Sequence, residues 1–600
     1  MRTMKTIRAV QSYMLRHWMR LVAGLLLIII SNLIALVPAY ILQEAVDAVS
    51  RNASASVLTS YAFQIVGVAL GAAIFQFASR FVVNSVSRTI EYEMRRDLFL
   101  HFQRMDVAYF QERKIGDLVA RATNDLSQVR QMLGPGITNL TNSIVAFTVT
   151  AVAMVSIDPQ LTFYALTVMP LMTIFFIAVS GTIHRRFRRV QDQFGEVSAR
   201  AQENFSGIRV VKAYAQEEAE LASFNTINAE YVRRSISFAR VNSLLWPAMY
   251  FIAGLAVAVL IWRGGVDVIS GRITVGRLVQ FNAYLAALSW PMTALGWTVN
   301  LLQQGSASLG RITEVRETPP AIASAPDASA EAIPTRGEVE FRHVSLSYGE
   351  REVLHDISIH VPGGSSLAIV GPTGAGKSSL VNLLARVMDV TSGAALIDGR
   401  DVREIPLPEL RRVIGYVPQE NFLFSLTVRE NVGFGRPDLT DEELERALDI
   451  SQLGNDVADF PEGVKTMIGE RGVTLSGGQK QRAGIARAVA KEPLILVLDD
   501  SLSSVDTHTE AEIERRLRTV MRDRTTIVIA HRISTIKDLD QIVVMDEGRI
   551  IERGKHLELL AQGGLYASMY RHQLLAEEME EDDPLSGITT DEALTLSEEE

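Results

Sequence analysis

Gly371-Pro-Thr-Gly-Ala-Gly-Lys-Ser-Ser379 is the stretch of sequence that decides the fold of the C-terminal half. Its residue types and spacing match the Walker A loop, in which glycines let backbone N–H groups approach phosphate oxygens. A β-branched apolar run, Ser366–Val370, precedes the loop, and a helical pattern, Leu380–Arg386, follows it. This strand–loop–helix order places the positive end of a helix dipole beside the phosphates. The sequence therefore predicts an α/β phosphate-binding domain.

The loop side chains and a second motif predict how a nucleotide and its metal ion are held. Lys377 reaches the β- and γ-phosphates, and the Ser378 hydroxyl coordinates Mg²⁺. Downstream, Ile495–Asp499 has the pattern of a buried parallel strand that ends in a carboxylate, a Walker B motif that places Asp499 at the same Mg²⁺. We therefore predict ATP and Mg²⁺ as cofactors. The nucleotide-binding residues predicted in the loop are Gly371, Thr373, Gly374, Gly376, Lys377, Ser378 and Ser379.

The N-terminal half has a different composition. Hydrophobic residues make up 48% of the chain and charged residues 21%, but the long apolar runs lie in the N-terminal half. A membrane-spanning helix needs about 20 mostly apolar residues, whereas a buried helix of a soluble protein normally keeps a polar face. Cysteine is absent, which excludes disulfides, thiolate metal sites and cysteine nucleophiles. Six segments qualify as spanning helices, at about 21–46, 59–83, 136–157, 160–181, 243–262 and 276–300.

The charges of the connecting segments predict the orientation. Lys and Arg are concentrated before the first span and in two long connections, 84–133 and 182–240. By the positive-inside rule, the N-terminus, both long connections and the C-terminal half are cytoplasmic. The long connections have helical spacing, so the membrane helices are expected to continue into the cytoplasm and meet in turns. The candidate turns are Ile115–Asp125 and Asn204–Gln216, with plain hairpins of no special role as the alternative.

The predicted spans contain polar residues but few full charges. Arg80 is the main charged residue, near the cytoplasmic end of the second span. Such a pathway suits bulky amphipathic solutes better than small ions, whose routes usually carry intramembrane acids or bases. The alternative is that these residues are contacts between helices and anchors at the membrane interface. The polar and aromatic set is Gln64, Gln76, Asn139, Asn142, Gln280, Asn282, Asn300, Trp246, Trp290 and Trp297.

The domain boundaries follow from changes in composition. A transmembrane domain is predicted at 1–316, a Pro/Ala/Ser-rich linker at 317–336 and the α/β domain at 337–576. Residues 577–600 contain eleven Asp or Glu and no Lys or Arg, so this tail is expected to be disordered. The net charge of −10 lies in that tail and the rest is near neutral, so no nucleic-acid partner is indicated.

One further motif adds a family resemblance. Leu475-Ser-Gly-Gly-Gln479 resembles the signature motif of ATP-binding cassette transporters, and the resemblance extends over nearly the whole chain. It implies a half-transporter of the bacterial multidrug and antigen-peptide exporter type in the inner (cytoplasmic) membrane. The two candidate turns would then be coupling helices. In such proteins the signature of one chain completes the nucleotide site of another, which would assign Ser476, Gly478 and Gln479 to ATP.

The resemblance also implies roles for single residues. Tyr348 resembles the aromatic residue that stacks on adenine, and Gln419 resembles the Q-loop glutamine that contacts Mg²⁺ and the membrane domain. Gly469–Gly472 resembles the exporter X-loop, and Ser503–Asp506 resembles the D-loop. His531 resembles the switch histidine that contacts the γ-phosphate.

Asp500 departs from the family pattern. The family normally has Glu after the Walker B aspartate, where it polarises the attacking water, and aspartate is shorter by about 1.5 Å. We expect an impaired catalytic site, the alternative being a conservative replacement that still hydrolyses ATP. An intact signature beside a weakened Walker site resembles one subunit, the A subunit, of asymmetric heterodimeric exporters of the TmrAB type. The implied partner is a second half-transporter with an intact catalytic Glu.

Three functions fit this reading. The first is ATP-driven export of amphipathic solutes (drugs, lipids or peptides) through the lipid bilayer. The second is a regulatory or gating subunit that binds ATP without turnover at this site. The third is a siderophore importer built on the exporter fold.

Overall fold

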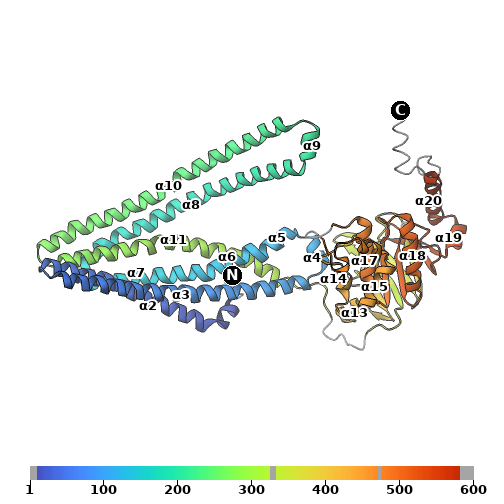
Figure 1. The fold of residues 1–600 in the computed structure, drawn as a ribbon, viewed down its shortest axis with the longest axis horizontal. Helices are drawn as coiled ribbons and strands as arrows, with labels where there is room; N and C mark the ends of the chain where they lie inside the picture. Colours follow the sequence, from blue (N-terminus) through green and yellow to red (C-terminus); the bar gives the residue numbers. More distant parts are fainter. Residues whose placement is uncertain (1–9, 325–332, 470–473, 531, 582–600) are drawn as a thin grey trace. The chain divides into compact units, whose positions relative to one another are not determined.

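The computed structural model describes residues 10–324, 333–469, 474–530 and 532–581. It divides into two compact units, the first formed by residues 1–103 with 113–319 and the second by residues 104–112 with 320–600. The first unit is helical and the second combines helices with β-sheets (Figure 1). This confirms the predicted fold class, a helical transmembrane domain followed by an α/β domain.

In the described part of the first unit, six long helices make up most of the structure. Asp158 starts one of them by accepting a hydrogen bond from the backbone N–H of Leu161 at 2.8 Å, with Pro159 as the first helical residue. Thr274 caps another in the same way, on the N–H of Arg277 at 3.1 Å. The helices are α2 (Trp18–Ser50), α3 (Ala55–Arg104), α7 (Ile137–Ile157), α8 (Pro159–Ser206), α10 (Glu217–Ile269) and α11 (Val275–Glu317).

The predicted membrane spans lie within these helices. Among the described residues, five helices are long and apolar enough to cross a membrane. The sixth predicted span, 276–300, lies in α11, which is helical throughout but has Gln280 and Asn282 in its apolar stretch. α3 alone has 50 residues, or about 75 Å at 1.5 Å per residue, more than twice the thickness of a hydrocarbon core. The prediction that helices continue beyond the membrane is therefore confirmed.

The first predicted turn was wrong by about ten residues. The chain reverses between Arg104, where α3 ends, and Ile115, where α5 (Ile115–Ala120) begins. The short helix α4 (Val107–Gln111) fills this reversal, and Asp106 caps it by accepting a hydrogen bond from the N–H of Tyr109 at 3.3 Å. The predicted turn 115–125 is instead α5 followed by the π-helical η1 (Arg121–Asp125).

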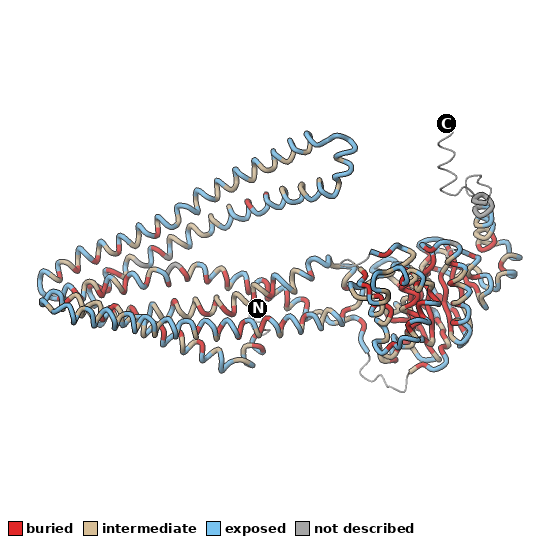
Figure 2. Tube along the Cα trace, viewed as in Figure 1, coloured by how far each residue is buried: buried red, intermediate tan, exposed pale blue. Residues whose placement is uncertain are grey.

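The helices after η1 and the second cytoplasmic turn agree better with the sequence prediction. After η1 come α6 (Leu126–Gln131) and the π-helical η2 (Met132–Gly136), which lead directly into α7. The second predicted turn is confirmed, because α9 (Ile208–Ala213) lies between α8 and α10 inside the range 204–216. Figure 2 shows this hairpin as mainly exposed or half-buried.

The described residues of the second unit form three β-sheets. The strand order is β2-β1-β4-β5 in the first sheet, β12-β11-β3-β10-β9-β6 in the second and β7-β8 in the third. In the second sheet β11, β3, β10, β9 and β6 are parallel and only β12 is antiparallel. The strands are β1 (Val339–Tyr348), β2 (Arg351–Val361), β3 (Ser366–Val370), β4 (Ser392–Ile397), β5 (Arg400–Asp401), β6 (Ile414–Val417), β7 (Leu426–Thr427), β8 (Met467–Ile468), β9 (Ile495–Asp499), β10 (Thr525–Ile529), β11 (Gln541–Asp546) and β12 (Arg549–Gly554).

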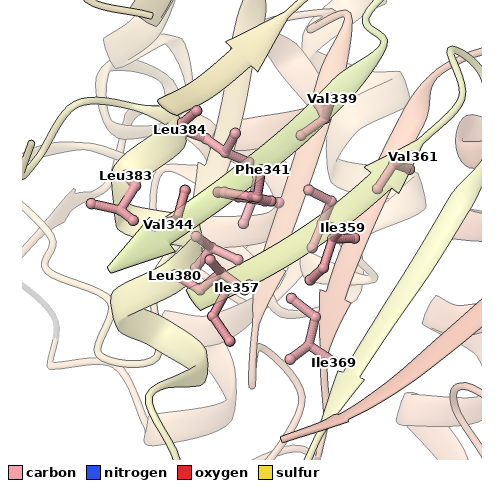
Figure 3. Close-up of a cluster of buried hydrophobic side chains, with 14 of the residues drawn as sticks. Val339, Phe341, Val344, Ile357, Ile359, Val361, Ile369, Leu380, Leu383 and Leu384 are labelled. Carbon is pink, nitrogen blue, oxygen red and sulfur yellow. The ribbon is translucent and has the colours of Figure 1, made fainter. Parts of the chain in front are cut away.

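Helices of the second unit pack on these sheets. Apolar side chains from β1, β2, β3 and α12 form the core that joins two sheets, with Phe341 and Leu380 at its centre (Figure 3). All five residues of β9 are buried, as its continuous apolar run predicts for a parallel strand covered on both faces. The helices are α12 (Lys377–Leu384), α13 (Leu407–Val413), α14 (Val428–Val432), α15 (Asp441–Ile450), α16 (Leu453–Ala458), α17 (Gly477–Ala490), α18 (Thr507–Met521), α19 (His556–Gln562) and α20 (Leu565–Glu581), with short 3₁₀ turns at 433–435 and 463–465.

Two predicted boundaries shift. Residues 317–319, at the start of the predicted linker, belong to the first unit. Later linker residues pack in the second unit, because Ile322 is buried and Ser324 Oγ accepts a hydrogen bond from the N–H of Leu407 at 3.0 Å. Residues 325–332 lie outside the described residues. The tail predicted to be disordered from residue 577 starts as helix, since α20 runs to Glu581. Residues 582–600 lie outside the described residues.

Candidate nucleotide-binding site

The Walker A loop joins β3 to α12 and depends on its glycines. Gly371 and Gly376 have φ angles of +148° and +91°, a region that side chains disfavour. A Cβ atom on Gly371 would lie 2.0 Å from the carbonyl oxygen of Met545, and one on Gly376 would lie 2.7 Å from Leu354. The glycines therefore serve the packing of the loop on its neighbours as well as the approach of phosphate predicted from the sequence.

The predicted metal ligands of the two Walker motifs meet. Ser378 Oγ donates a hydrogen bond to Asp499 Oδ1 at 3.0 Å, and the Tyr416 hydroxyl lies 3.4 Å from Asp499 Oδ2. A hydroxyl and a carboxylate are hard oxygen ligands, the kind that Mg²⁺ takes alongside phosphates and water. Among the described residues, no group of three or more His, Cys, Asp or Glu side chains is placed to hold a metal ion. The Ser378 hydroxyl and the Asp499 carboxylate, which the sequence predicts as ligands, are of the chemical type that Mg²⁺ takes.

The charged groups of the site are buried. Burial raises the pKa of Asp499, opposed by the hydrogen bond from Ser378 and the charge of Lys377. Burial lowers the pKa of Lys377, opposed by the charges of Asp499 and Asp500. Lys377 Nζ donates to the carbonyl oxygens of Gly371 and Pro372 at 2.7 and 2.9 Å, so its ammonium group lies against the loop. A buried cation at this place favours the binding of anionic phosphate oxygens.

Asp500 lies at the end of β9 in a left-handed conformation with φ +48°. Its N–H donates to the carbonyl oxygen of Ile529 at 2.9 Å. Its side chain accepts a long hydrogen bond, 3.4 Å, from Gln419 Nε2. The structure thus brings Gln419 close to Asp500 at the end of the Walker B strand, and the roles that the family resemblance implies for the two residues stay predictions. His531 lies outside the described residues, as do residues 470–472 of the predicted X-loop.

The predicted adenine-stacking residue lies beside the loop. The Tyr348 hydroxyl is 3.3 Å from Ser379 Oγ and donates to Met388 Sδ at 3.1 Å. The tyrosine is 42% exposed, so part of its side chain remains open to solvent. Thr373 is also exposed, at the outer part of the loop.

The signature motif forms the N-terminus of α17. Ser476 Oγ accepts a hydrogen bond from the N–H of Gln479 at 3.2 Å, and Gln479 Oε1 accepts one from the N–H of Ser476 at 2.9 Å, which is a capping box. Gln479 Nε2 also donates to Asp456 at 2.9 Å. The side chain predicted to contact nucleotide is therefore engaged within its own domain. Among the described residues, no hydrogen bond joins Ser476, Gly478 or Gln479 to the Walker motifs.

The signature helix instead contacts the D-loop. Gln481, which is buried, donates from Nε2 to Ser503 Oγ at 3.0 Å and accepts at Oε1 from the N–H of Ser504 at 2.9 Å. Gly478 faces the same loop, because a Cβ there would lie 2.9 Å from the carbonyl oxygen of Ser504. Asp506 accepts a hydrogen bond from the N–H of Thr509 at 2.9 Å and so caps α18.

Three residues of the site region escaped the sequence analysis. Gln481 lies two residues after the signature motif, and its position was the only sequence feature that could have pointed to a role in the site. Tyr416 precedes Gln419 in the same motif, and burial raises its pKa. Glu510 lies in α18 and lines a cavity of about 330 Å³ with Asp500 and Arg532. Burial raises the pKa of Glu510 to about 6, opposed by the charge of Arg532, with which it forms an ion pair.

Comparisons with known proteins match both halves of the chain. Residues 21–292 match the family described as ABC transporter transmembrane region, and residues 354–503 match the family described as ABC transporter. A Bacillus subtilis relative, a probable multidrug resistance ABC transporter ATP-binding/permease protein (YheI), is 36% identical over 93% of this chain and 96% of its own. The chain belongs to the ABC transporter family. It is a multi-pass membrane protein of the ATPase-coupled transporter type.

Two further similarities concern exporters. An ATP-dependent lipid A-core flippase of Desulfotalea psychrophila is 32% identical over 89% of this chain and 93% of its own. The solved structure of a bacterial Atm1-family ABC exporter with ATP bound superposes with a TM-score of 0.79, at 29% identity, over 92% of this chain and 99% of that one. The order of domains and the fold are therefore those of an ABC exporter.

Proposed function

We propose that this chain is one half of an ATP-driven exporter of amphipathic solutes and works in a heterodimer with a second half-transporter. Support for the cargo comes from the names of two relatives, one a multidrug resistance transporter and the other a lipid A-core flippase. Such cargo combines apolar and polar parts, which suits helices that carry amides and tryptophans in their apolar stretches.

The observation that carries the dimer is the separation of the two halves of the nucleotide site. Ser378 and Asp499 meet within 3.0 Å, yet the signature residues Ser476 and Gly478 have no bond to them among the described residues. A γ-phosphate held by one chain then needs the signature of another. The chain would contribute Ser476 and Gly478 to its partner's site and receive the partner's signature at its own.

The second cytoplasmic turn offers a surface for that partner. α9 has no buried residue, and Ile208, Val210 and Tyr214 are 44%, 61% and 72% exposed. Apolar side chains gathered on a cytoplasmic turn are expected to be covered in the assembled protein. We propose that α9 docks on the partner's cassette, the α/β domain that binds the nucleotide.

In the nucleotide site, the loop N–H groups and Lys377 would hold the phosphates, with Thr373, Gly374 and Ser379 beside them. Mg²⁺, which neutralises charge on the phosphates when bound, would be held by Ser378 and Asp499 with Gln419 near. Tyr348 would stack on adenine and His531 would contact the γ-phosphate, as the family resemblance implies. Asp506 would contribute through the D-loop.

The site of this chain is proposed to hydrolyse ATP slowly. Asp500 has a short side chain that already lies at the long distance of 3.4 Å from Gln419. Water positioning is most of what the protein supplies to phosphoryl transfer, and a displacement near 1 Å costs about 100-fold in rate. The partner, with Glu at the corresponding place, would carry most of the turnover.

A transport experiment tests this proposal. The chain is reconstituted into inside-out proteoliposomes alone and together with a second half-transporter that carries the catalytic Glu, and uptake of a fluorescent amphipath is followed with ATP or ADP. We expect uptake with ATP only when both chains are present. Equal uptake and hydrolysis by the chain alone would refute the heterodimer.

Asp500 also favours one alternative, a regulatory or gating subunit. The same vesicles separate it from the exporter, because a gating subunit would show ATP-dependent opening without accumulation against a gradient. A siderophore importer, the third reading, would move its cargo in the opposite direction.

A further inference from the structure

A polar cavity lies among four helices of the first unit, apart from the nucleotide site. It has a volume of about 150 Å³ and is lined by residues of α2, α3, α7 and α11. Whole drug-sized ligands usually occupy about 300–1,000 Å³, so this cavity has room for a headgroup. Hydrogen-bonding side chains make up most of its wall, among them Gln76, Arg80, Thr138, Asn139, Asn142 and Ser143.

Several of these groups have hydrogen-bonding capacity left over. Thr138 and Ser143 are 9% and 1% exposed, and their hydroxyls have no hydrogen-bond partner in the described part of the chain. Asn142 accepts a hydrogen bond from Asn32 at 2.9 Å through its carbonyl oxygen, which leaves its amide N–H groups as donors. Buried polar groups are normally paired, so unpaired hydroxyls on a cavity wall indicate a site for a polar ligand.

The charge of the cavity has one sign. Arg80 lines it, and among the described residues no Asp or Glu does. Within the described residues Arg80 forms no ion pair. Arg80 is exposed and lies near the cytoplasmic end of the predicted span, so its guanidinium group is accessible to a ligand in the cavity. An unpaired arginine among amide and hydroxyl donors therefore fits a ligand that brings the negative charge.

A larger open cavity of about 620 Å³ adjoins the first through Gln76 and Arg80. Its wall is a single face of α3, on which Gln76, Arg80, Asn84 and Arg88 recur every fourth residue. Phe77 and Phe81, 71% and 65% exposed and stacked with ring centroids 6.1 Å apart, flank this polar stripe. An apolar tail can lie along the phenylalanines while a headgroup contacts the stripe.

We propose that the cavity between α2, α3, α7 and α11 binds an oxyanion headgroup (phosphate, sulfonate or carboxylate) carried by an amphipathic substrate, and that Arg80 selects its negative charge. This inference names the substrate class of the exporter and in that respect rests on the proposed function. Guanidinium groups pair with oxyanions through two parallel hydrogen bonds, and the neighbouring amides and hydroxyls supply further donors.

The test is a binding measurement that does not need turnover. Two fluorescent probes with the same alkyl tail, one ending in a sulfonate and the other in trimethylammonium, are titrated against the full-length transporter in nanodiscs of neutral lipid. We expect the sulfonate probe to bind about ten-fold more tightly, the factor that corresponds to one charge-assisted hydrogen bond. Arg80→Gln should remove this preference and Arg80→Lys should keep part of it, while Arg51→Gln, in the turn after α2, leaves it unchanged.

A second variant covers the case in which Arg80→Gln does not fold. Thr138→Val removes a hydroxyl without a partner and keeps the shape, so it should leave stability unchanged yet weaken binding of the sulfonate probe several-fold. Equal affinity for both probes, or a preference that survives Arg80→Gln, overturns the inference. Full competition by millimolar inorganic phosphate would show a site for free anions and overturns the amphipathic substrate.

Transport in the same preparation separates the two proposals. If the charge preference is present but no ATP-driven uptake of any amphipath occurs, the proposed function fails and the anion site stands. If uptake occurs without any dependence on headgroup charge or on Arg80, the exporter stands and the anion site fails.

Discussion

Replacing Asp500 with Glu tests how distance limits catalysis in this chain. The Asp500 carboxylate lies 3.4 Å from Gln419 Nε2, at the outer limit of a hydrogen bond. One additional methylene moves the carboxylate outward by about 1.5 Å. Because a misplacement of about 1 Å can cost about 100-fold in rate, Asp500→Glu should raise hydrolysis at this site by about 100-fold, or about 2.7 kcal/mol of barrier.

The assay must isolate this site from that of the partner. The assembled transporter is prepared with the partner's catalytic carboxylate changed to an amide, and hydrolysis of limiting radiolabelled ATP is followed as a single turnover. Asp500→Asn serves as the isosteric control and should stay at the low rate. Adding Lys377→Ala to Asp500→Glu should abolish the gain, because the phosphates are then no longer held.

Two results would contradict this reasoning. If Asp500→Glu changes the rate by less than two-fold while ATP still binds, side-chain length is not what limits the site. If Asp500→Asn abolishes hydrolysis in the otherwise unmodified transporter while the same change in the partner does not, Asp500 is the working carboxylate and the proposed asymmetry is wrong.

Three further predictions concern the cassette. Ser476→Ala should lower turnover of the heterodimer at least ten-fold, whereas the loss of its hydrogen bond at the start of α17 should lower the stability of the domain by only about 1 kcal/mol. If turnover falls no more than this loss of stability explains, Ser476 does not act in the partner's nucleotide site. Lys377→Ala should weaken binding of a fluorescent ATP analogue at this site yet leave more than half of the ATPase activity, and complete inactivation would argue for two equal sites. The pKa of Glu510 is raised to about 6, so the folded state binds this proton more tightly than the unfolded state and loses stability as pH rises from 4.5 through 6. Glu510→Gln cannot ionise and should therefore gain stability relative to the parent over that window, by less than about 2 kcal/mol because solvent reaches the Arg532 ion pair. A stability difference that is independent of pH in thermal melts would refute this.

The cassette was predictable because its motifs are local. Gly371–Ser379 contains the loop, the glycines it requires and the start of its helix within nine residues. The strand Ile495–Asp499 is apolar without interruption, which in a parallel sheet means burial on both faces. Ser378 and Asp499 are 121 residues apart, yet each motif fixes the end of a neighbouring element, so their meeting at 3.0 Å follows.

The first cytoplasmic turn was missed because its signal is weak. Asp106 is a good N-cap residue, but α4 after it has only five residues, too few to show a hydrophobic period. The predicted stretch, 115–125, contains Gly116 and Asn124, which favour turns, but Asp117 in the first turn of α5 is stabilised by the helix dipole. The capping box of Ser476 and Gln479 could have been recognised, since Ser followed three residues later by Gln is its sequence pattern.

The polar cavity could not have been predicted from the sequence. Arg80, Asn142 and Trp290 come from three helices, and the face that each helix turns towards the others depends on packing that no local pattern specifies. From the sequence alone, these residues fit either a transport pathway or contacts between helices. The structure shows that they line one cavity with unpaired hydroxyls in its wall, which favours a ligand-binding role that can be tested.

Hydrogen bonds within the nucleotide-binding domain connect Asp500 to the signature helix, which is proposed to complete the partner's site. Gln481 on the signature helix donates to Ser503 Oγ at 3.0 Å, and that hydroxyl donates to the carbonyl oxygen of Asp500 at 3.2 Å. Gln481 also accepts from the N–H of Ser504, so two bonds tie the signature helix to the D-loop. Because Gln481 is buried, loss of these bonds would leave unpaired polar groups, at a cost of about 1–3 kcal/mol. On the proposed asymmetry, Gln481 therefore links the backbone at Asp500 to the signature helix that is proposed to complete the partner's site.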